Sequence, residues 1–450
     1  MKKRMISALA AMLALVMTAG CSENGGALSS GSSSSSTSSS SSSLESAESV
    51  SSSESTEQSS VESSSENVPV EVSSSVEDVV VPPVEVTADN MMNSIRLFDV
   101  ISQGKENSMF SPLSLNMALG LLAEGAEGGS KSALNAYLGT ENYSDFAEHY
   151  MQIVKGQYNY VSEYEDGWKN VFELANSFWA NEKLPFKEDY QSRLTEKFGA
   201  EVRNIDFGDK TNALNAINGW VSEKTHKMIP SVINDYSEDI AAVLVNTVYF
   251  ESAWRDKWSV YEDWKQPFTA LDGSAKELPL MHNSGRSYFE NAQATAFSCG
   301  YLNGLEFIGI LPKETGDFSI ESLDIPSLLE SESFEYDVAA KMPRLEFETE
   351  IPLTATLKAF GLEEIFDPQR ADFSGISDEA LFVSDVLQKT KLELDENGTK
   401  AAAATVISID TAAEPIEREK KEVTLDRPFA FMIYDSAEGQ IVFLGKVTAP

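Results

Sequence analysis

Three stretches in the first half of the chain space their apolar residues as helices do. The pair Ser111-Pro112 opens the first, because Ser is a good N-cap and Pro fits the first helical position. The residues that follow, 113–123, are apolar on most faces, so we predict a deeply buried helix. Two amphipathic helices are predicted further on, at residues 186–198 and 212–228.

Strand patterns dominate the later part of the chain. Residues 241–250 form a continuous Val-rich apolar run, which predicts a strand buried on both faces. Within residues 381–396, Thr390, Leu392 and Leu394 alternate with charged side chains, which predicts a long strand with one solvent-exposed face. Two further strands, 429–435 and 440–447, are joined by a short turn. Helices early and strands late predict an α+β fold with large antiparallel sheets.

The first ninety residues are not predicted to belong to this fold. Residues 1–20 combine a basic start with a short apolar run, as a secretory signal peptide does. Their end, before Cys21, resembles a bacterial lipobox, in which the Cys becomes the lipidated N-terminus; an ordinary signal with an incidental Cys is the alternative. Residues 21–90 are mostly Ser with scattered Glu and predict a flexible tether. The fold is expected to occupy residues 91–450.

Charge and cysteine content narrow the class of protein. The net charge is −37. Without the signal and the tether, 31 basic and 59 acidic residues leave −28, the wrong sign for a nucleic-acid binder. The two cysteines are Cys21 and Cys299, so no internal disulfide is expected once Cys21 is acylated. Stability must then come from a large core.

Signatures of catalysis are scarce. The three histidines, His149, His226 and His282, are far apart and lack neighbours at metal-ligand spacing, so neither a metal nor a cofactor is predicted. Ser102 and Lys105 match the S-x-x-K pattern of Ser-Lys hydrolases, but so short a pattern occurs by chance and its usual companions are missing. The chain is predicted to bind rather than to catalyse.

One segment, residues 396–413, combines features that are seldom found together. Asn397-Gly398 is a strong hairpin-turn signal. From Thr399 to Thr411 one alternating set is small or apolar, and the charges fall on the other set, as in a half-buried strand. Yet residues 401–404 are four alanines, which are poor strand formers. A permanent hairpin strand, a short alanine helix and a loop that can become a strand all remain open.

This segment resembles the hinge and reactive-centre loop of inhibitory serpins: an acidic residue, then Gly, Thr and a run of alanines closing in Thr. Other serpin landmarks follow in the family's order and together span residues 91–450: Ser111-Pro112-Leu113-Ser114, Asn246 to Phe250 with Trp254, Phe360 to Gly375, Asp426 to Phe429, and Gly445 to Val447. The chain is therefore identified as a member of the serpin family.

The resemblance implies a fold and a mechanism. The fold would be α+β, with a large antiparallel main sheet, additional sheets, about eight or nine helices and an exposed reactive-centre loop. The protein would be a suicide-substrate inhibitor of serine proteases, in which the cut loop inserts into the main sheet and carries the acyl-enzyme away. The family's hinge-to-bond spacing gives Ala412-Ala413 as the reactive bond, with Thr411-Ala412 as the alternative. Small residues there suit elastase-like or subtilisin-like proteases.

The resemblance also assigns residues to two regions that control insertion. The hinge would comprise Glu396, Gly398, Thr399, Ala401, Ala402, Ala403, Ala404 and Thr405. The shutter and breach beneath the opening sheet would comprise Ser111, Ser114, Asn246, Trp254 and Gln388. Gln388 stands where the family often has His, and we expect it to hydrogen-bond with Ser114 and Asn246.

Partners and location follow from the same reading. We expect a monomer that binds serine proteases but no nucleic acid, and that is anchored to a membrane only through a lipid on Cys21. It would be extracellular, either secreted or a lipoprotein on the outer face of the cytoplasmic membrane. A serpin fold without inhibition, used for surface binding or storage, is the alternative. Bulky or charged hinges are typical of such members, and Ala401 to Ala404 favour the inhibitor.

Overall fold

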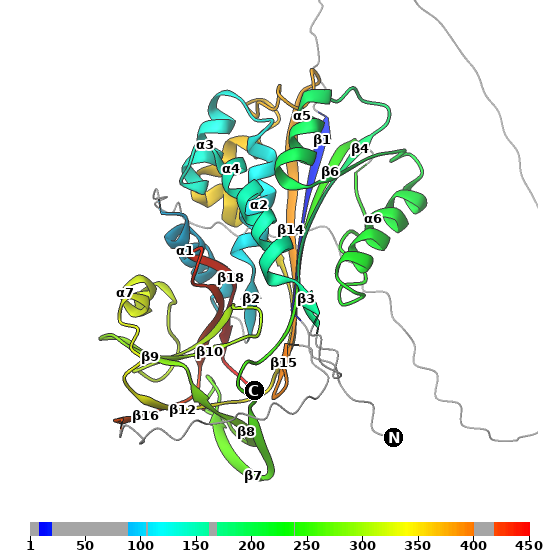
Figure 1. Cartoon of the computed structure of the whole chain (residues 1–450). Helices are drawn as coiled ribbons and strands as arrows, with labels where there is room; N and C mark the ends of the chain where they lie inside the picture. The colour runs from blue at the N-terminus through cyan, green and yellow to red at the C-terminus, as the bar shows by residue number, and fades with distance from the viewer. Residues whose placement is uncertain (1–8, 20–88, 105–106, 162–168, 238, 400–417) are drawn as a thin grey trace, which may run out of the picture. The chain divides into compact units, whose positions relative to one another are not determined.

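The structure is a computed structural model of the whole chain, and it describes residues 9–19, 89–104, 107–161, 169–237, 239–399 and 418–450 (Figure 1). All of these belong to one compact unit; the second unit, residues 22–79, lies outside the described residues. Cys21 and the loop 400–417 also lie outside them. The loop includes the predicted reactive bond and hinge residues Ala401 to Thr405.

Eight α-helices lie within the described residues: α1 Asn90–Ser102, α2 Pro112–Ala123, α3 Gly128–Leu138, α4 Tyr143–Ile153, α5 Glu188–Phe198, α6 Lys210–Lys224, α7 Ile325–Glu330 and α8 Thr354–Leu357. Helix α2 is buried along its whole length, as its apolar sequence predicts. Ser111 is its N-cap and accepts a hydrogen bond from the Ser114 N–H. Helix α6 ends four residues before the predicted limit, where the Thr225 hydroxyl donates to the Val221 carbonyl.

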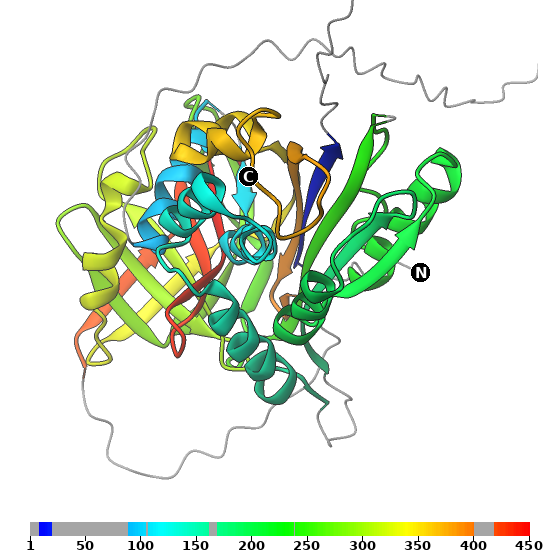
Figure 2. The ribbon, with the colours of Figure 1, turned by 90° about the horizontal axis from the view of Figure 1, so that it is seen from above.

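The main sheet has eight strands: β1 Leu9–Ala19, β3 Tyr160–Val161, β4 Lys169–Asn181, β5 Glu201–Ile205, β6 Ile240–Ala253, β13 Leu345–Pro352, β14 Leu381–Asp395 and β15 Gly398–Thr399. Across the sheet, β13 pairs with β14, and β6 pairs with β4. Both β1 and β15 lie between β14 and β6 and pair with both of them. The blue β1 between the orange and green strands is visible in Figures 1 and 2.

Two smaller sheets complete the unit. The first has six strands: β2 Ser108–Phe110, β9 Ser287–Glu290, β10 Ala294–Gly300, β11 Glu306–Pro312, β17 Phe429–Asp435 and β18 Gln440–Val447. The other has four: β7 Ser259–Thr269, β8 Ala275–Gly285, β12 Asp337–Met342 and β16 Lys420–Thr424. Most pairings are antiparallel, but β4 with β5 and β12 with β16 are parallel. The α+β prediction is confirmed; the main sheet and the four-stranded sheet are mixed, and the pairings of the six-stranded sheet are all antiparallel.

Helices cover both faces of the main sheet. On one face lie α2 and its neighbours, over the larger hydrophobic core. On the other lies α6, over a smaller cluster that includes Trp179, Trp220 and Tyr249. Strand β6 is buried on both sides for this reason, as its unbroken apolar run predicts. The solvent-exposed face predicted for β14 is half-buried at Lys391, Glu393 and Asp395. Lys389 on the same face is buried, with 8% exposed, and its Nζ lies 2.7 Å from a Glu350 carboxylate oxygen.

Among the strands of the main sheet that the apolar pattern did not predict are β4 and β1. Strand β4 contains Asn, Ser, Glu and Ala, which are weak strand formers, and its place between β6 and β5 decides its conformation. Strand β1 consists of the apolar run that predicts a signal peptide. That prediction remains a prediction, because the structure is that of the uncut chain.

Candidate functional site

The hinge turns back on the end of β14. The chain reverses at Glu396 and Asn397, and β15 then pairs with Leu394 and Asp395. The hairpin predicted at Asn397-Gly398 is present, with its turn one residue earlier. Gly398 has φ +139°, and a Cβ there would collide with main-chain atoms of Ser252 and Ala253 on β6. Only Gly suits this position, because it has no side chain and tolerates positive φ.

Thr399 points into the core, as its place in the alternating pattern predicts. It is fully buried, and its Oγ1 lies 3.0 Å from the Tyr301 hydroxyl oxygen. Burial raises the pKa of Tyr301 well above its ordinary value, so the phenol stays neutral and can donate or accept. The sequence gave no motif that marks Tyr301, and reasoning from the sequence missed it.

Trp254, which directly follows β6, hydrogen-bonds to the turn through both its side chain and its main chain. Its Nε1 donates to the Asp395 carbonyl at 2.9 Å, and its main-chain N–H donates to the Asn397 carbonyl at 3.3 Å. Its ring stacks on Tyr301 with centroids 4.3 Å apart. Trp254 and Tyr301 therefore hold the turn and the first inserted residue together.

An ion pair fixes the outer side of the turn. The Arg344 Nε donates to Glu396 at 2.8 Å, and its Nη2 donates to Glu262 at the same distance. Burial is the largest single influence on the pKa of Glu396 and would raise it. The hydrogen bond from Arg344, a main-chain hydrogen bond and the charges of Arg344 and Lys257 together outweigh burial and hold the pKa below its ordinary value. The acidic residue at the start of the hinge is thus ionised and paired.

Deeper in the sheet, hydrogen bonds join buried polar side chains, among them the expected shutter residues Ser114 and Asn246. The Ser114 hydroxyl donates to the Asn246 Oδ1 at 2.5 Å, and the Asn246 Nδ2 donates to the Asn176 Oδ1 at 2.8 Å. Asn176 in turn donates to the Phe198 carbonyl at the end of α5. The chain of bonds thus links α2, β6, β4 and α5. The sequence predicted Ser114 and Asn246 but missed Asn176, although that Asn sits at an inward position of β4.

Gln388 does not hydrogen-bond with Ser114 or Asn246, contrary to the expectation. Its Oε1 accepts from the Ser111 N–H at 2.8 Å and its Nε2 donates to the Ser111 carbonyl at 3.0 Å. The reason is the distance between β14, which carries Gln388, and β6, which carries Asn246. Leu13 of β1 pairs with Gln388 on one side and with Asn246 on the other, so two strand spacings, about 9.5 Å, divide β14 from β6.

The space between β6 and β14, which we call the central lane, holds β15 and β1 in one continuous register. Thr399 lies opposite Leu394 and Ser252, and Leu9 lies opposite Leu392 and Phe250. One lane position separates them, opposite Glu393 and Glu251. Both strands run antiparallel to β6 and β14. Strand β1 is therefore placed as a direct continuation of β15 would be, although the two come from opposite ends of the chain.

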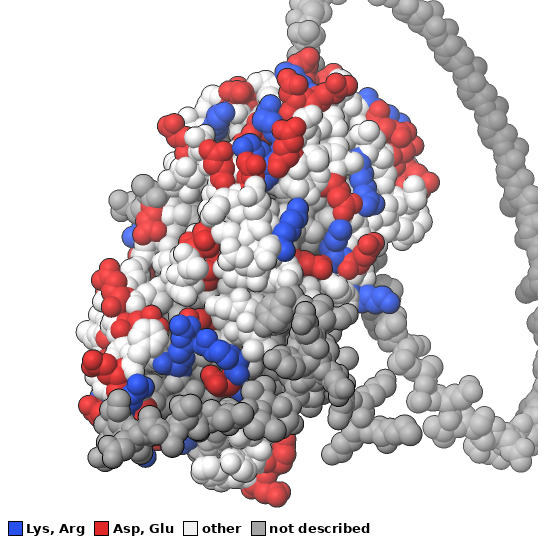
Figure 3. All heavy atoms as spheres, in the orientation of Figure 1, with Lys and Arg blue, Asp and Glu red and all other residues white. Residues whose placement is uncertain are grey.

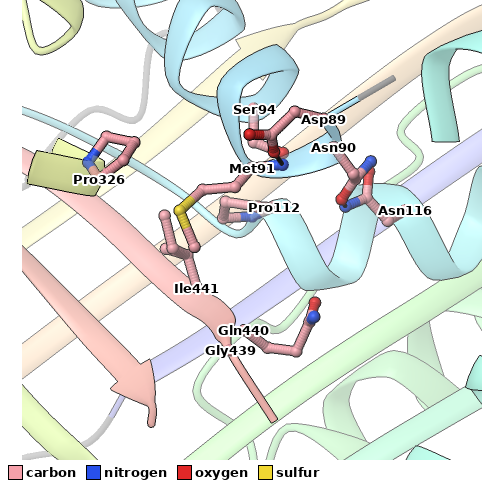
Figure 4. A pocket seen from close by; sticks show the side chains of 10 residues that line it. All are labelled: Asp89, Asn90, Met91, Ser94, Pro112, Asn116, Pro326, Gly439, Gln440 and Ile441. Atoms are coloured by element: carbon pink, nitrogen blue, oxygen red, sulfur yellow. Dashed lines mark hydrogen bonds between the residues drawn. The ribbon is translucent and has the colours of Figure 1, made fainter. Parts of the chain in front are cut away.

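Two pockets border these regions. One of about 1000 Å³ opens beside the hinge turn, where Trp254, Asn397, Arg255 and His282 are among the lining residues. The other, of about 660 Å³, lies where α1 begins (Figure 4). There the Asn116 Nδ2 donates to the Asn90 Oδ1 at 2.6 Å, which ties the start of α1 to α2.

The expectations about metal binding, the S-x-x-K pattern and charge can be compared with the described residues. No group of His, Cys, Asp or Glu among them has the geometry to hold a metal ion. Ser102 is buried at the end of α1, and Lys105 lies outside the described residues. Acidic and basic side chains are interspersed over the face shown in Figure 3. Among the helices that the structure describes, none has the length and apolar character needed to cross a membrane.

Comparisons with known proteins agree with this geometry. The serpin (serine protease inhibitor) family model matches residues 88–450. A serpin-like protein of Thermococcus kodakarensis is 30% identical over 373 residues, covering 80% of this chain and 85% of the relative. Leukocyte elastase inhibitor A of Mus musculus is 27% identical over 386 residues, covering 81% of this chain and all of the relative.

Solved structures share the fold. The native state of the thermophilic serpin tengpin matches with a TM-score of 0.66 at 30% identity, covering 81% of this chain and 93% of tengpin. The native stressed conformation of an Arabidopsis serpin matches with a TM-score of 0.68 at 21% identity, covering 82% and 99%. With the hinge turn, the shutter and the main sheet arranged as described, the chain belongs to the serpin family of serine protease inhibitors.

Proposed function

We propose that this chain is a suicide-substrate inhibitor of elastase-like or subtilisin-like serine proteases, and that it traps the acyl-enzyme by inserting its reactive loop into the central lane. The observation that carries the proposal is the lane itself. The hinge residues Gly398 and Thr399 already occupy one end of it, paired with both β14 and β6. The rest of the lane accepts an eleven-residue strand in the same direction and register.

The charge at the first free lane position supports this mechanism. If the register of β15 continued by one residue, Lys400 would lie directly opposite Glu393 and Glu251. Directly opposite residues in a sheet share a face, and opposite charges there are favourable by roughly 0.2–1 kcal/mol per pair. The loop thus carries a cation where the lane presents two carboxylates.

The rest of the loop fits the lane by the same extension. Thr405 would lie between Gln388 and Asn246, on the face where the buried polar side chains of the shutter lie. Ile407 would lie opposite Val386 and Leu244, the position that the fully buried Leu15 takes in β1. The alternating set of small and apolar residues therefore meets the core, as a half-buried strand requires.

The length of the lane favours the proposed reactive bond. Counted in the same register, the last residue of β1, Ala19, holds the position of Thr411. Everything from the hinge to the residue before Ala412 would then be accommodated, a span of roughly 50 Å. We propose Ala412-Ala413 as the bond that is attacked, with Thr411-Ala412 as the alternative, because small residues suit the shallow pocket of elastase-like enzymes.

Incubation with elastase tests the proposal. The full chain and a chain that begins at residue 21, with Cys21→Ser, are each mixed with pancreatic elastase, boiled in SDS and separated on a gel. We expect at least the shorter form to yield an SDS-resistant adduct, and mass spectrometry of the released peptide to begin at Ala413 or Ala412. Simple cleavage of both forms without adduct would favour the non-inhibitory alternative. Cleavage after Arg418 would overturn the proposed bond.

We propose in addition that residues 1–20 are removed during export and that Cys21 is lipidated, so that residues 21–90 tether a monomeric inhibitor to the outer face of the cytoplasmic membrane. The support is the apolar run and the lipobox-like end. Expression in a bacterial host, with labelled palmitate and mass spectrometry of the N-terminal peptide, tests it. Release of unlabelled protein into the medium would contradict lipidation of Cys21 and would support only the predicted secretory signal.

A further inference from the structure

The central lane is filled by a segment of the chain's own N-terminus. Strand β1 pairs with β14 through Leu9 to Ala19 and with β6 through Leu9 to Thr18. Each edge of the lane offers one ladder of N–H and C=O groups, so the lane holds one strand at a time. While β1 is in place, only the two residues of β15 can share the lane with it.

The middle of β1 is packed on both faces. Leu15 and Met17 are fully buried in the larger core. Ala14 is 2% exposed and joins the smaller cluster beneath α6, where Val16 also packs. At the point where the register shifts, the Ser384 hydroxyl donates to the Val16 carbonyl at 3.1 Å. A strand with matched side chains on both faces, and a satisfied carbonyl at its irregular point, fits its place closely.

The segment matches the loop in size at the described inward positions. In the common register, Leu15 and Met17 lie where the loop would bring Ile407 and Ile409, and side chains of similar size bury similar apolar surface. On the other face, Ala14 and Val16 lie where the loop would bring Val406 and Ser408.

We infer that residues 9–19 are an intramolecular ligand of the central lane, and that the chain is blocked as an inhibitor until they are removed. This inference rests on the proposed function. A chain that retains the segment has its main sheet already complete, so a protease that attacks the loop would cut it as an ordinary substrate. Removal of residues 1–20, which the sequence predicts for export, would free the lane and couple inhibitory activity to processing.

Two measurements that need no protease test whether the segment occupies the lane. Both use the full chain, produced without export so that it stays uncut, and the chain from residue 21 with Cys21→Ser. We expect the full chain to melt higher by about 10 °C or more. Amides of residues 9–19 should exchange with solvent roughly 100-fold more slowly than in the free peptide. Equal melting temperatures and free exchange would overturn the inference.

Adduct formation with elastase then tests the block. We expect the full chain to form at least about tenfold less SDS-resistant adduct than the chain from residue 21. The double variant Leu15→Asp with Met17→Asp should restore adduct in the full chain, because two buried charges expel the strand. Val16→Thr, on the opposite and half-buried side, is the matched control and should stay blocked. Equal adduct from both unaltered forms would contradict the block.

A peptide distinguishes the inference from the proposed function. The synthetic peptide of residues 9–19 is added to the chain from residue 21, beside the same peptide with L15D and M17D. We expect the first to raise the melting temperature and suppress adduct, and the second to do neither. If the first peptide stabilises the chain but no form ever yields adduct, the proposed function fails while the lane occupant stands. If adduct forms regardless of the peptide, the inference fails and the inhibitor stands.

Discussion

The hydroxyl oxygens of Tyr301 and Thr399 lie 3.0 Å apart, both in fully buried residues, and this contact anchors the first inward-facing residue of the hinge. Thr399 reaches this place because β15 has already entered the lane between β14 and β6. Gly398 and Thr399 are therefore already paired with both strands, and under the proposed mechanism insertion of the loop would have to continue from Thr399.

Thr399→Arg should convert the inhibitor into a substrate. A charged side chain has no partner beside the Tyr301 hydroxyl, and burial of an uncompensated charge costs about 3–5 kcal/mol. The measurement is the yield of SDS-resistant elastase adduct from the chain beginning at residue 21, which should fall at least about tenfold. Thr399→Val, which removes the hydroxyl but keeps the shape, is the control and should retain adduct. Persistence of adduct in the Arg variant would show that the inward face of the loop has been misassigned.

Lys400→Glu should slow insertion without changing how the loop is cut. If the register of β15 continued by one residue, Lys400 would lie opposite Glu393 and Glu251, so Glu at this position would place three carboxylates together. We expect the fraction of encounters that end in adduct to fall several-fold in stopped incubations with elastase, with the total rate of loop cleavage unchanged. Lys400→Gln, which removes the charge without reversing it, should lie between the two. An effect of Gln equal to that of Glu would exclude the charge as the cause.

Asn176→Ala should destabilise the uncut protein. Its Oδ1 accepts from Asn246 and its Nδ2 donates to the Phe198 carbonyl, so the variant leaves buried groups without partners at a cost of about 1–3 kcal/mol. Urea unfolding followed by tryptophan fluorescence measures the loss. The exposed Asn142→Ala, at a helix start where the side chain makes no capping hydrogen bond, is the control. Equal midpoints for the two variants would mean that the shutter contributes nothing to the uncut state.

Acid should weaken the outer side of the hinge turn. Because the pKa of Glu396 is lowered in the folded chain, its pairing with Arg344 stabilises the fold fully above the unfolded pKa of about 4.3. The contribution is lost as pH falls through the folded pKa. The free-energy gap between the native protein and Glu396→Gln should thus be constant from pH 8 to about pH 5 and shrink below it. The gap should be at most about 1 kcal/mol, since the pair is partly exposed. A free-energy gap that widens below pH 5 would show that the folded chain raises the pKa of Glu396 and does not lower it.

Local sequence signals predicted several elements closely. The Ser111-Pro112 start of α2 and the strands 429–435 and 440–447 are found as expected. The inward direction of Thr399 also followed from alternation alone. These features depend on caps, spacing and side-chain period, which act over a few residues and can be seen in the chain itself.

Other features could not be predicted because they depend on neighbours far away in the chain. Gln388 bonds to Ser111 and not to Asn246 because another strand lies between β14 and β6. Asn176 completes the shutter only once β4 pairs with β6. Tyr301 meets Thr399 across 98 residues of sequence. No local pattern carries such information.

The sequence by itself determined the family, the turn of the hinge and the inward direction of Thr399, since each follows from a motif or from the two-residue period of a strand. Only the tertiary structure decided what fills the central lane. Residues 9–19, an apolar run, and the loop after Thr399, with its alternating pattern, can each be a strand, and the sheet offers room for one of them. Which one it holds depends on the surface that each buries against β6 and β14, and that is a property of the folded sheet rather than of either segment.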